Sequence, residues 1–211
     1  MFYLVRMPWW LKKIYDPASS LIWRMPVNKE KILYLTFDDG PHPVITPWVL
    51  EVLRKHDARA TFFCIGKNVK GYPEILRSTL MAGHRVGNHS YDHLNGWKTE
   101  DGKYLENIRA AAQLIDSDLY RPPYGRIRRF QAMLLGRGAV PYRIIMWDVL
   151  SGDFDKRLSG TRCAHNVIRY ARPGSIIVFH DSEKAFDRLR EALPMVLEHL
   201  SRLGYRFESI R

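Results

Sequence analysis

Residues 32–43 read ILYLTFDDGPHP, an apolar run that ends in two adjacent aspartates and is followed by a turn with two prolines. Successive side chains of a β-strand point to opposite faces, so Asp38 and Asp39 cannot both do the same work at a strand end. The pattern therefore predicts a buried strand whose end presents two carboxylates with separate roles. A simple turn built from good turn residues is the alternative interpretation of DDG.

Short runs of β-forming residues alternate with segments of helical pattern along the rest of the chain. Strands are expected at 32–37, 60–66, 84–89, 142–149, 175–180 and 205–210, and helices at 46–57, 73–83, 103–118, 126–137, 165–174 and 188–204. Such alternation is typical of parallel β/α units. Six or seven units in 211 residues are too few for an eightfold barrel of usual size. We therefore expect an α/β fold built as a distorted, shortened (β/α) barrel, with an open sheet as the alternative.

Polar residues gather where the predicted strands end. They lie in the segments TFDD (36–39), GNHSYDH (87–93), RPPYG (121–125), WDV (147–149) and VFHD (178–181). In parallel β/α folds the carboxyl ends of the strands meet at one rim, which is where catalytic and binding sites form. Five polar segments at one rim predict a functional site there.

His89 and His93 are four residues apart, just after a predicted strand. A helical turn would bring two imidazoles at this spacing onto one side, which is a common start of a zinc site, although a purely structural pair is the alternative. Together with Asp39 they form a two-histidine, one-carboxylate set with open positions for water and substrate, as in catalytic metal sites. The set suits Zn²⁺ first and also Co²⁺, Ni²⁺ or Fe²⁺. Asp38 is then free to act as a base on water.

The motifs TFDDGPHP, HSYDH, RPPYG, WDVLSGDF and VFHD stand in the order of the five motifs of NodB-like polysaccharide deacetylases, carbohydrate esterase family 4. Nearly all of the chain after the N-terminal segment resembles this family. The resemblance implies a distorted (β/α) barrel and a divalent-metal enzyme that removes N-acetyl groups from amino sugars such as N-acetylglucosamine. It also implies that Asp38 is the catalytic base, that Asp39, His89 and His93 bind the metal, and that Arg121 orients the base.

The same resemblance implies roles for residues of the later motifs. His180 would act as the general acid that protonates the leaving amine, and the backbone N–H of Tyr124 would stabilise the oxyanion. Trp147 and either Val178 or Phe179 would form walls of the acetyl pocket, next to Tyr124.

The fourth motif departs from the family pattern, which usually reads Trp-x-x-Asp-x-x-Asp-Trp. Here Leu150 stands in the first aspartate position, and Phe154 replaces the final tryptophan. Asp153 is therefore the first candidate to orient His180, and Asp148 is the second. Because all metal-binding and base positions are intact, we expect an active enzyme.

The expected substrate is an acetylated amino sugar in an oligosaccharide, a polysaccharide or a lipid-linked precursor. A deacylase for a different amide is one alternative, and a non-catalytic carbohydrate-binding homologue is another. Against the latter, a protein that only binds sugar needs no complete set of base, metal ligands and acid.

The net charge and the N-terminal sequence limit which partners and which location are expected for the protein. With 33 Lys and Arg against 22 Asp and Glu, the net charge is +11, which favours polyanions or an anionic membrane surface. No nucleic-acid-binding motif accompanies the charge, so we expect no specific nucleic-acid partner. The sequence has no signal-peptide core and no stretch near the about 20 apolar residues of a membrane span. We therefore expect a monomeric, cytoplasmic protein.

Residues 1–28 are expected to form an aromatic and basic segment, and residues 29–211 a single catalytic domain. At helical spacing, Trp10, Leu11, Ile14 and Tyr15 form an apolar arc with two lysines opposite. This segment is predicted either to pack on the barrel or to contact an anionic membrane reversibly.

Overall fold

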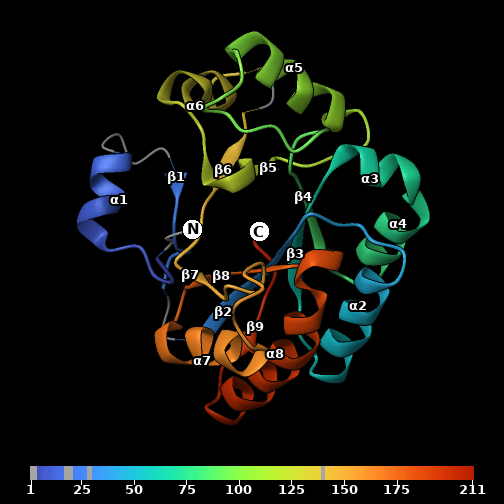
Figure 1. The fold of residues 1–211 in the computed structure, drawn as a ribbon, viewed down its shortest axis with the longest axis vertical. Coiled ribbons are helices and arrows are strands. Elements are labelled where there is room, and N and C mark those ends of the chain that lie inside the picture. The colour runs from blue at the N-terminus through green and yellow to red at the C-terminus, as the bar shows by residue number, and fades with distance from the viewer. Residues whose placement is uncertain (1–3, 17–20, 28–29, 139–140) are drawn as a thin grey trace.

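The computed structural model describes residues 4–16, 21–27, 30–138 and 141–211. Parallel strands form one curved sheet at the centre of Figure 1, in the order β1-β6-β5-β4-β3-β2-β8-β7, and β9 pairs with β2 beside this path. The predicted distorted, shortened (β/α) barrel is confirmed. The strands are β1 (Leu21–Ile22), β2 (Ile32–Asp38), β3 (Ala60–Cys64), β4 (Arg85–Asn88), β5 (Leu119–Tyr120), β6 (Arg143–Ile145), β7 (Val149–Leu150), β8 (Ile176–His180) and β9 (Arg206–Phe207).

Helices surround the outer side of the sheet (Figure 1). They are α1 (Trp9–Tyr15), α2 (Ile45–Lys55), α3 (Gly66–Gly71), α4 (Pro73–Met81), α5 (Asp101–Ala112), α6 (Arg129–Gly136), α7 (Gly160–Tyr170) and α8 (Glu183–Arg202), with a short 3₁₀ turn η1 at Pro123–Gly125. In the part of the chain that the structure describes, none of these helices is both long and apolar enough to cross a membrane.

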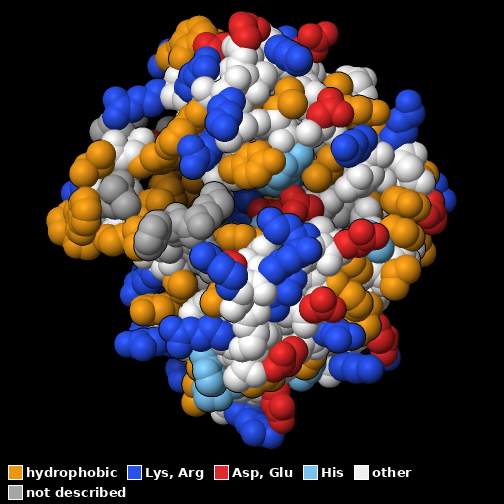
Figure 2. Space-filling model, in the orientation of Figure 1, with side chains coloured by type: hydrophobic (Ala, Val, Ile, Leu, Met, Phe, Trp, Pro, Cys, Tyr) orange, Lys and Arg blue, Asp and Glu red, His pale blue; other side chains and the backbone are white. Residues whose placement is uncertain are grey.

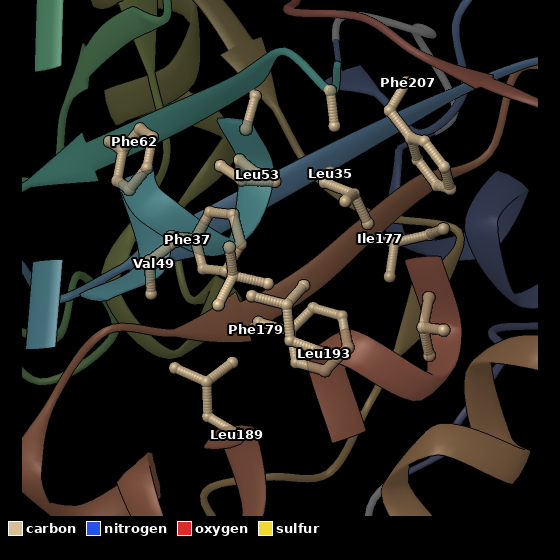
Figure 3. Close-up of a cluster of buried hydrophobic side chains, with 14 of the residues drawn as sticks. Leu35, Phe37, Val49, Leu53, Phe62, Ile177, Phe179, Leu189, Leu193 and Phe207 are labelled. Carbon is tan, nitrogen blue, oxygen red and sulfur yellow. The ribbon is translucent and has the colours of Figure 1, made fainter. Parts of the chain in front are cut away.

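The largest hydrophobic cluster lies between the central strands and the helices that cover them (Figure 3). Leu35 and Phe37 of β2 point to this side, where they meet Phe179 of β8 and side chains of α2 and α8. Since side chains alternate along a strand, Thr36 and Asp38 of β2 point to the inside of the barrel. Because of this alternation, the apolar side chains of β2 pack in the core and the side chain of one aspartate lies on the inner face.

The structure differs from the predicted elements in a few places. The run at 142–149 forms two strands, because after β6 the chain crosses to the other end of the sheet and forms β7 beside β8. Strands β1 and β5 and helix α3 were not predicted, since they are two to six residues long and carry little periodicity.

The N-terminal segment joins the two ends of the sheet. Strand β1 pairs with β6 at one end. At the other end the N–H of Leu150 donates to the carbonyl of Val5 (2.8 Å), and Arg6 pairs in an antiparallel bridge with Val149. The described part of residues 1–28 therefore packs on the barrel and spans the seam between β6 and β7.

Asp148 lies at this seam and is buried. Its carboxylate accepts a hydrogen bond from Nζ of Lys12 (2.9 Å) and lies 3.7 Å from Nε of Arg6 and 3.5 Å from Nε of Arg24. Burial raises the pKa of Asp148, but the hydrogen bonds from Lys12 and Ser175 and the charges of Lys12 and Arg24 lower it more, so the pKa falls below its usual range. Asp148 therefore binds the N-terminal segment and does not orient His180, for which it was the second candidate.

Candidate active site

Strand β2 sends its two adjacent aspartates in different directions. Asp38 ends the strand on the inner face, beside His180, which is its register partner on β8. Asp39 follows with φ of 81°, in the left-handed region, so its side chain turns away from the strand. The N–H of Gly40 donates to Oδ1 of Asp181 (3.0 Å), and a Cβ at Gly40 would clash with that carboxylate. The tight turn after the strand thus requires glycine and holds Asp39 in place.

Asp39, His89 and His93 form a cluster of possible metal ligands. One ligand atom from each lies within 4.8 Å of the other two. Oδ1 of Asp39 is 3.3 Å from Nε2 of His93 and 3.7 Å from Nε2 of His89. The three residues come from the ends of β2 and β4 and from the loop after β4, as expected for a site at the carboxyl rim of the sheet.

The two histidines approach each other through a bend and not through the predicted helical turn. His89 follows β4 directly, and the loop then reverses with Ser90 and His93 both at positive φ (63° and 58°). Nδ1 of His89 donates to the backbone carbonyl of Arg121 (2.8 Å), which leaves the lone pair of Nε2 facing Asp39. Burial lowers the pKa of His89 to about 4, so this imidazole is neutral, the form that binds a metal.

The donor set fits a divalent cation. Oδ1 of Asp39 is buried and has no hydrogen-bond donor in the described residues. Burial raises the pKa of Asp39, but the nearby imidazoles of His93, His180 and His89 lower it more. The pKa therefore lies well below its usual range, and the carboxyl group is ionised at neutral pH. An ionised carboxylate whose buried Oδ1 accepts no hydrogen bond from the described part of the chain, beside a neutral imidazole, is expected where a metal completes the set of contacts.

Arg121 fixes the position of the Asp38 carboxylate. Its guanidinium is fully buried, and Nη1 donates to Oδ1 of Asp38 (2.7 Å) and to Oγ1 of Thr36 (2.6 Å). Nε and Nη2 donate to the carbonyls of Ile145 (3.2 Å) and Met146 (2.9 Å). A buried guanidinium with four hydrogen bonds has one orientation, so the position of the Asp38 carboxylate is fixed as well.

Asp153 pairs with His180. One carboxylate oxygen accepts from Nδ1 of His180 (2.8 Å), and the other accepts from its backbone N–H (2.7 Å). Burial lowers the pKa of His180, but Asp153 raises it more, to about 9. Nε of Arg188 on α8 donates to the backbone carbonyl of Asp153 (2.7 Å) and supports the loop. Asp153 was the first candidate from the sequence for the residue that orients His180, and in the structure it contacts His180.

The residues predicted to line a substrate pocket fall into two groups. Tyr124, in η1, is exposed, has φ of 60°, and its ring lies 4.5 Å from that of His93. Trp147 packs so closely against Gly125 that a Cβ at the glycine would clash with it. Val178 lies on the inner face, two residues before His180.

Phe179 does not line the site. Its ring stacks on that of Phe37 at 6.1 Å, within the core between β8 and α8 (Figure 3). Because neighbouring residues on a strand alternate, Phe179 points to the opposite face from Val178 and His180. Of the two residues predicted from VFHD for the pocket, only Val178 has a side chain on the inner face.

Several supporting residues were not found from the sequence. Thr36 accepts a hydrogen bond from Arg121, Arg188 donates to the backbone carbonyl of Asp153, and Asp181 holds the turn at Gly40. Burial raises the pKa of Asp181 to about 8, and Oγ1 of Thr46 donates to its carboxylate (2.5 Å). Only Asp181 had a visible signal, because it follows His180 in the VFHD motif.

Comparison with known proteins identifies the family. A family model described as polysaccharide deacetylase matches residues 8–133. The chain is 33% identical over 206 residues to a peptidoglycan-N-acetylglucosamine deacetylase of Bacillus cereus, covering 95% of each chain. It is 36% identical over 167 residues to a chitooligosaccharide deacetylase of Azorhizobium caulinodans, covering 75% of this chain and 77% of that one.

The fold comparison agrees. A crystal structure of a peptidoglycan N-acetylglucosamine deacetylase superposes with a TM-score of 0.84 at 28% identity, covering 97% of this chain and 95% of that chain. Both its sequence and its fold thus identify this chain as a member of the polysaccharide deacetylase family.

Proposed function

We propose that this protein is a metal-dependent hydrolase that removes N-acetyl groups from amino sugars, with N-acetylglucosamine in an oligosaccharide, a polysaccharide or a lipid-linked precursor as substrate. The single observation that carries the proposal is the arrangement at the ends of β2 and β8. There the Asp39 carboxylate and two histidines lie beside Asp38, held by Arg121, and His180, held by Asp153. The relatives that act on peptidoglycan and on chitooligosaccharides support the sugar substrate.

Asp39, His89 and His93 would hold the cation. A bound divalent metal supplies a Lewis acid that lowers the pKa of water and polarises the acetyl carbonyl. Three protein ligands leave coordination positions open, as in catalytic sites, and Zn²⁺ is the first candidate, with Co²⁺, Ni²⁺ and Fe²⁺ also suited to the donor set.

Asp38 acts as the base that takes a proton from the attacking water. Its carboxylate already accepts a charge-assisted hydrogen bond from Arg121 at 2.7 Å, so one oxygen is fixed and the side chain needs no reorientation. The backbone N–H of Tyr124 donates to the oxygen of the acetyl carbonyl as negative charge develops there. One such donor is typically worth a factor of about 10²–10³ in rate.

His180 gives a proton to the leaving amine nitrogen. With its pKa raised to about 9, its imidazole holds a proton at neutral pH, as a general acid must. The hydrogen bond from Nδ1 to Asp153 turns Nε2 toward the cleavage site. A cation bound at Asp39 would lower this pKa from about 9 toward neutrality, where proton donation is most effective.

Trp147, Val178 and Tyr124 form the surroundings of the acetyl group in this proposal. Val178 lies on the same inner face as His180, and Trp147 packs against Gly125 in the turn that carries Tyr124. The cytoplasmic location, the monomeric state and the lack of a nucleic-acid partner remain predictions from the sequence.

The test is acetate release from a panel of acetylated amino-sugar oligomers, peptidoglycan fragments and non-sugar amides. Each substrate is offered to metal-stripped protein and to protein restored with Zn²⁺, Co²⁺, Ni²⁺ or Fe²⁺. We expect release from the sugars only in the restored samples, with His93→Ala losing both metal and activity.

Release from non-sugar amides alone would indicate a deacylase for a different amide. Sugar binding without release in every metal would indicate a non-catalytic homologue. Full activity of the metal-stripped protein would contradict the metal assignment.

A further inference from the structure

Helix α1 presents aromatic and aliphatic side chains to solvent. Trp9 is 71% exposed, Trp10 52% and Ile14 63%. The inner side of the same helix is anchored, because Lys12 donates to Asp148 and the hydroxyl of Tyr15 donates to the carbonyl of Gly125 (2.8 Å). Figure 2 shows the resulting patch of hydrophobic side chains over α1 at the left edge of the molecule. Because the inner side is held, the three outward side chains stay exposed in the folded protein.

This arrangement corrects the apolar arc expected from the sequence. Tyr15 points inward and packs on Trp23 and Trp97, at ring distances of 5.9 and 6.1 Å. Trp9 joins Trp10 and Ile14 on the outer side, and the side chain of Leu11 lies outside the described residues.

Helix α6 continues the surface. Phe130, Met133 and Leu134 are among the exposed large hydrophobic residues, and Nη2 of Arg129 donates to the backbone carbonyl of Ile14 (3.3 Å), which links α6 to the end of α1. Tyr15, Phe130 and Met133 line one pocket between the two helices. The outer side of α1 and the exposed side chains of α6 therefore form one apolar surface, named here the α1–α6 surface.

The exposed charge of the α1–α6 surface is mainly basic. Lys12 is paired with Asp148 and Arg128 with Asp101, but residues 9–15 and 126–137 contain no Asp or Glu of their own. Lys13 and Arg137 are exposed. The chain as a whole carries +11, so an anionic partner is attracted to the molecule before it reaches this surface.

We propose that the α1–α6 surface binds reversibly to an anionic lipid bilayer. Tryptophan side chains favour the boundary between headgroups and acyl chains, and a helix with an apolar outer side and flanking lysines lies in that boundary. The anionic headgroups match the surplus of lysine and arginine. A bilayer is also a continuous, nearly flat partner, which can contact two helices from distant parts of the sequence at once.

The binding combines two contributions that can be separated. Attraction between headgroups and basic residues amounts to about fivefold in partitioning for each basic residue, and it weakens as salt screens it. Burial of the exposed apolar side chains does not depend on salt in this way. The proposal therefore predicts binding that is weakened by salt and strongly reduced when the apolar side chains are removed.

The experiment is co-sedimentation of the full chain with vesicles of phosphatidylcholine alone or mixed with phosphatidylglycerol, at low and high salt. One variant carries Trp9→Ser, Trp10→Ser and Ile14→Ser, and a second carries Lys13→Gln and Arg137→Gln. The matched control is Leu80→Ser with Met81→Ser, which removes exposed apolar side chains from α4, on the other side of the molecule. Circular dichroism of each variant checks that it is folded.

We expect the wild type and the α4 control to sediment with the mixed vesicles at low salt and much less with phosphatidylcholine alone. The serine variant should lose at least tenfold in partitioning, and the glutamine variant about 25-fold. A wild type that stays in solution with mixed vesicles at low salt overturns the proposal. So does a folded serine variant that binds like the wild type, since the attraction would then come from charge anywhere on the protein.

Discussion

Replacing Arg121 by methionine should destabilise the protein severely, although the new side chain is apolar and of similar length. The guanidinium is fully buried and donates four hydrogen bonds, to Asp38, to Thr36 and to the carbonyls of Ile145 and Met146. Without it, the buried Asp38 carboxylate loses its counter-charge and two carbonyl groups lose a donor. Breaking a buried ion pair on one side costs about 3–5 kcal/mol, a large part of a total stability of about 5–15 kcal/mol.

The assay is urea unfolding followed by tryptophan fluorescence in metal-free buffer. With a slope of about 2–3 kcal/mol/M, the midpoint should fall by about 1–2.5 M. Adding Asp38→Asn should recover about 2–3 kcal/mol, since the neutral amide no longer needs the cation. The exposed Arg77→Met on α4 is the control and should change stability by less than about 0.5 kcal/mol. A loss below about 1 kcal/mol for Arg121→Met, or strictly additive effects in the double variant, would refute the reasoning.

Three other predictions concern the site and its surroundings. Asp39→Asn should lose affinity for the metal in a titration, whereas Asp38→Asn should keep the metal and lose most turnover. Equal metal affinity of the two variants would contradict the separate roles. His180→Gln should slow the hydrolysis of amide substrates far more than that of activated acetate esters, whose leaving groups need no proton. Asp153→Asn should show the same pattern with smaller losses of rate. Equal losses on both kinds of substrate would indicate a structural role for His180. Burial lowers the pKa of His84 to about 4 in the folded protein, against 6.5 in the unfolded chain. Between these two values the unfolded chain binds a proton that the folded protein does not, so the free energy of unfolding should fall by about 2–3 kcal/mol as the pH drops from 6.5 to 4. Urea unfolding across this range should show a smaller drop in His84→Gln, and an unchanged drop would contradict the assignment.

The sequence predicted the rim of the barrel well because parallel strands leave few choices. Once alternation of strands and helices is recognised, every strand ends on the same side, so polar residues after separate strands must meet. Asp39, His89 and His93 were found in this way, although a bend with two residues at positive φ brings the histidines together. Such a bend has no simple sequence signal when the residues are Ser90 and His93 and not glycine.

Phe179 shows an error that strand parity could have prevented. If His180 points inward, its neighbour must point outward, and Val178 is then the inner residue. Arg188, in contrast, could not have been found, because an arginine on an amphipathic helix is normally exposed. Its contact with the carbonyl of Asp153 depends on how α8 packs against the loop, which is a tertiary property.

The joining of β6 and β7 by the N-terminal segment has a consequence for how the barrel opens. Strand β2 pairs with β3, β8 and β9, whereas the strands on the two sides of the seam, β6 and β7, have only three and two residues and are joined by contacts from residues 5–16 and 21–25. Local fluctuations should therefore begin at the seam, and amide hydrogens there should exchange with deuterium sooner than those of β2. The N–H groups of Met146 and Leu150, bonded to the carbonyls of Ile22 and Val5, report this directly. Loss of the contacts that Val5 and Arg6 make with β7 would then increase the local opening of the seam, although these residues are far from β6 in the sequence.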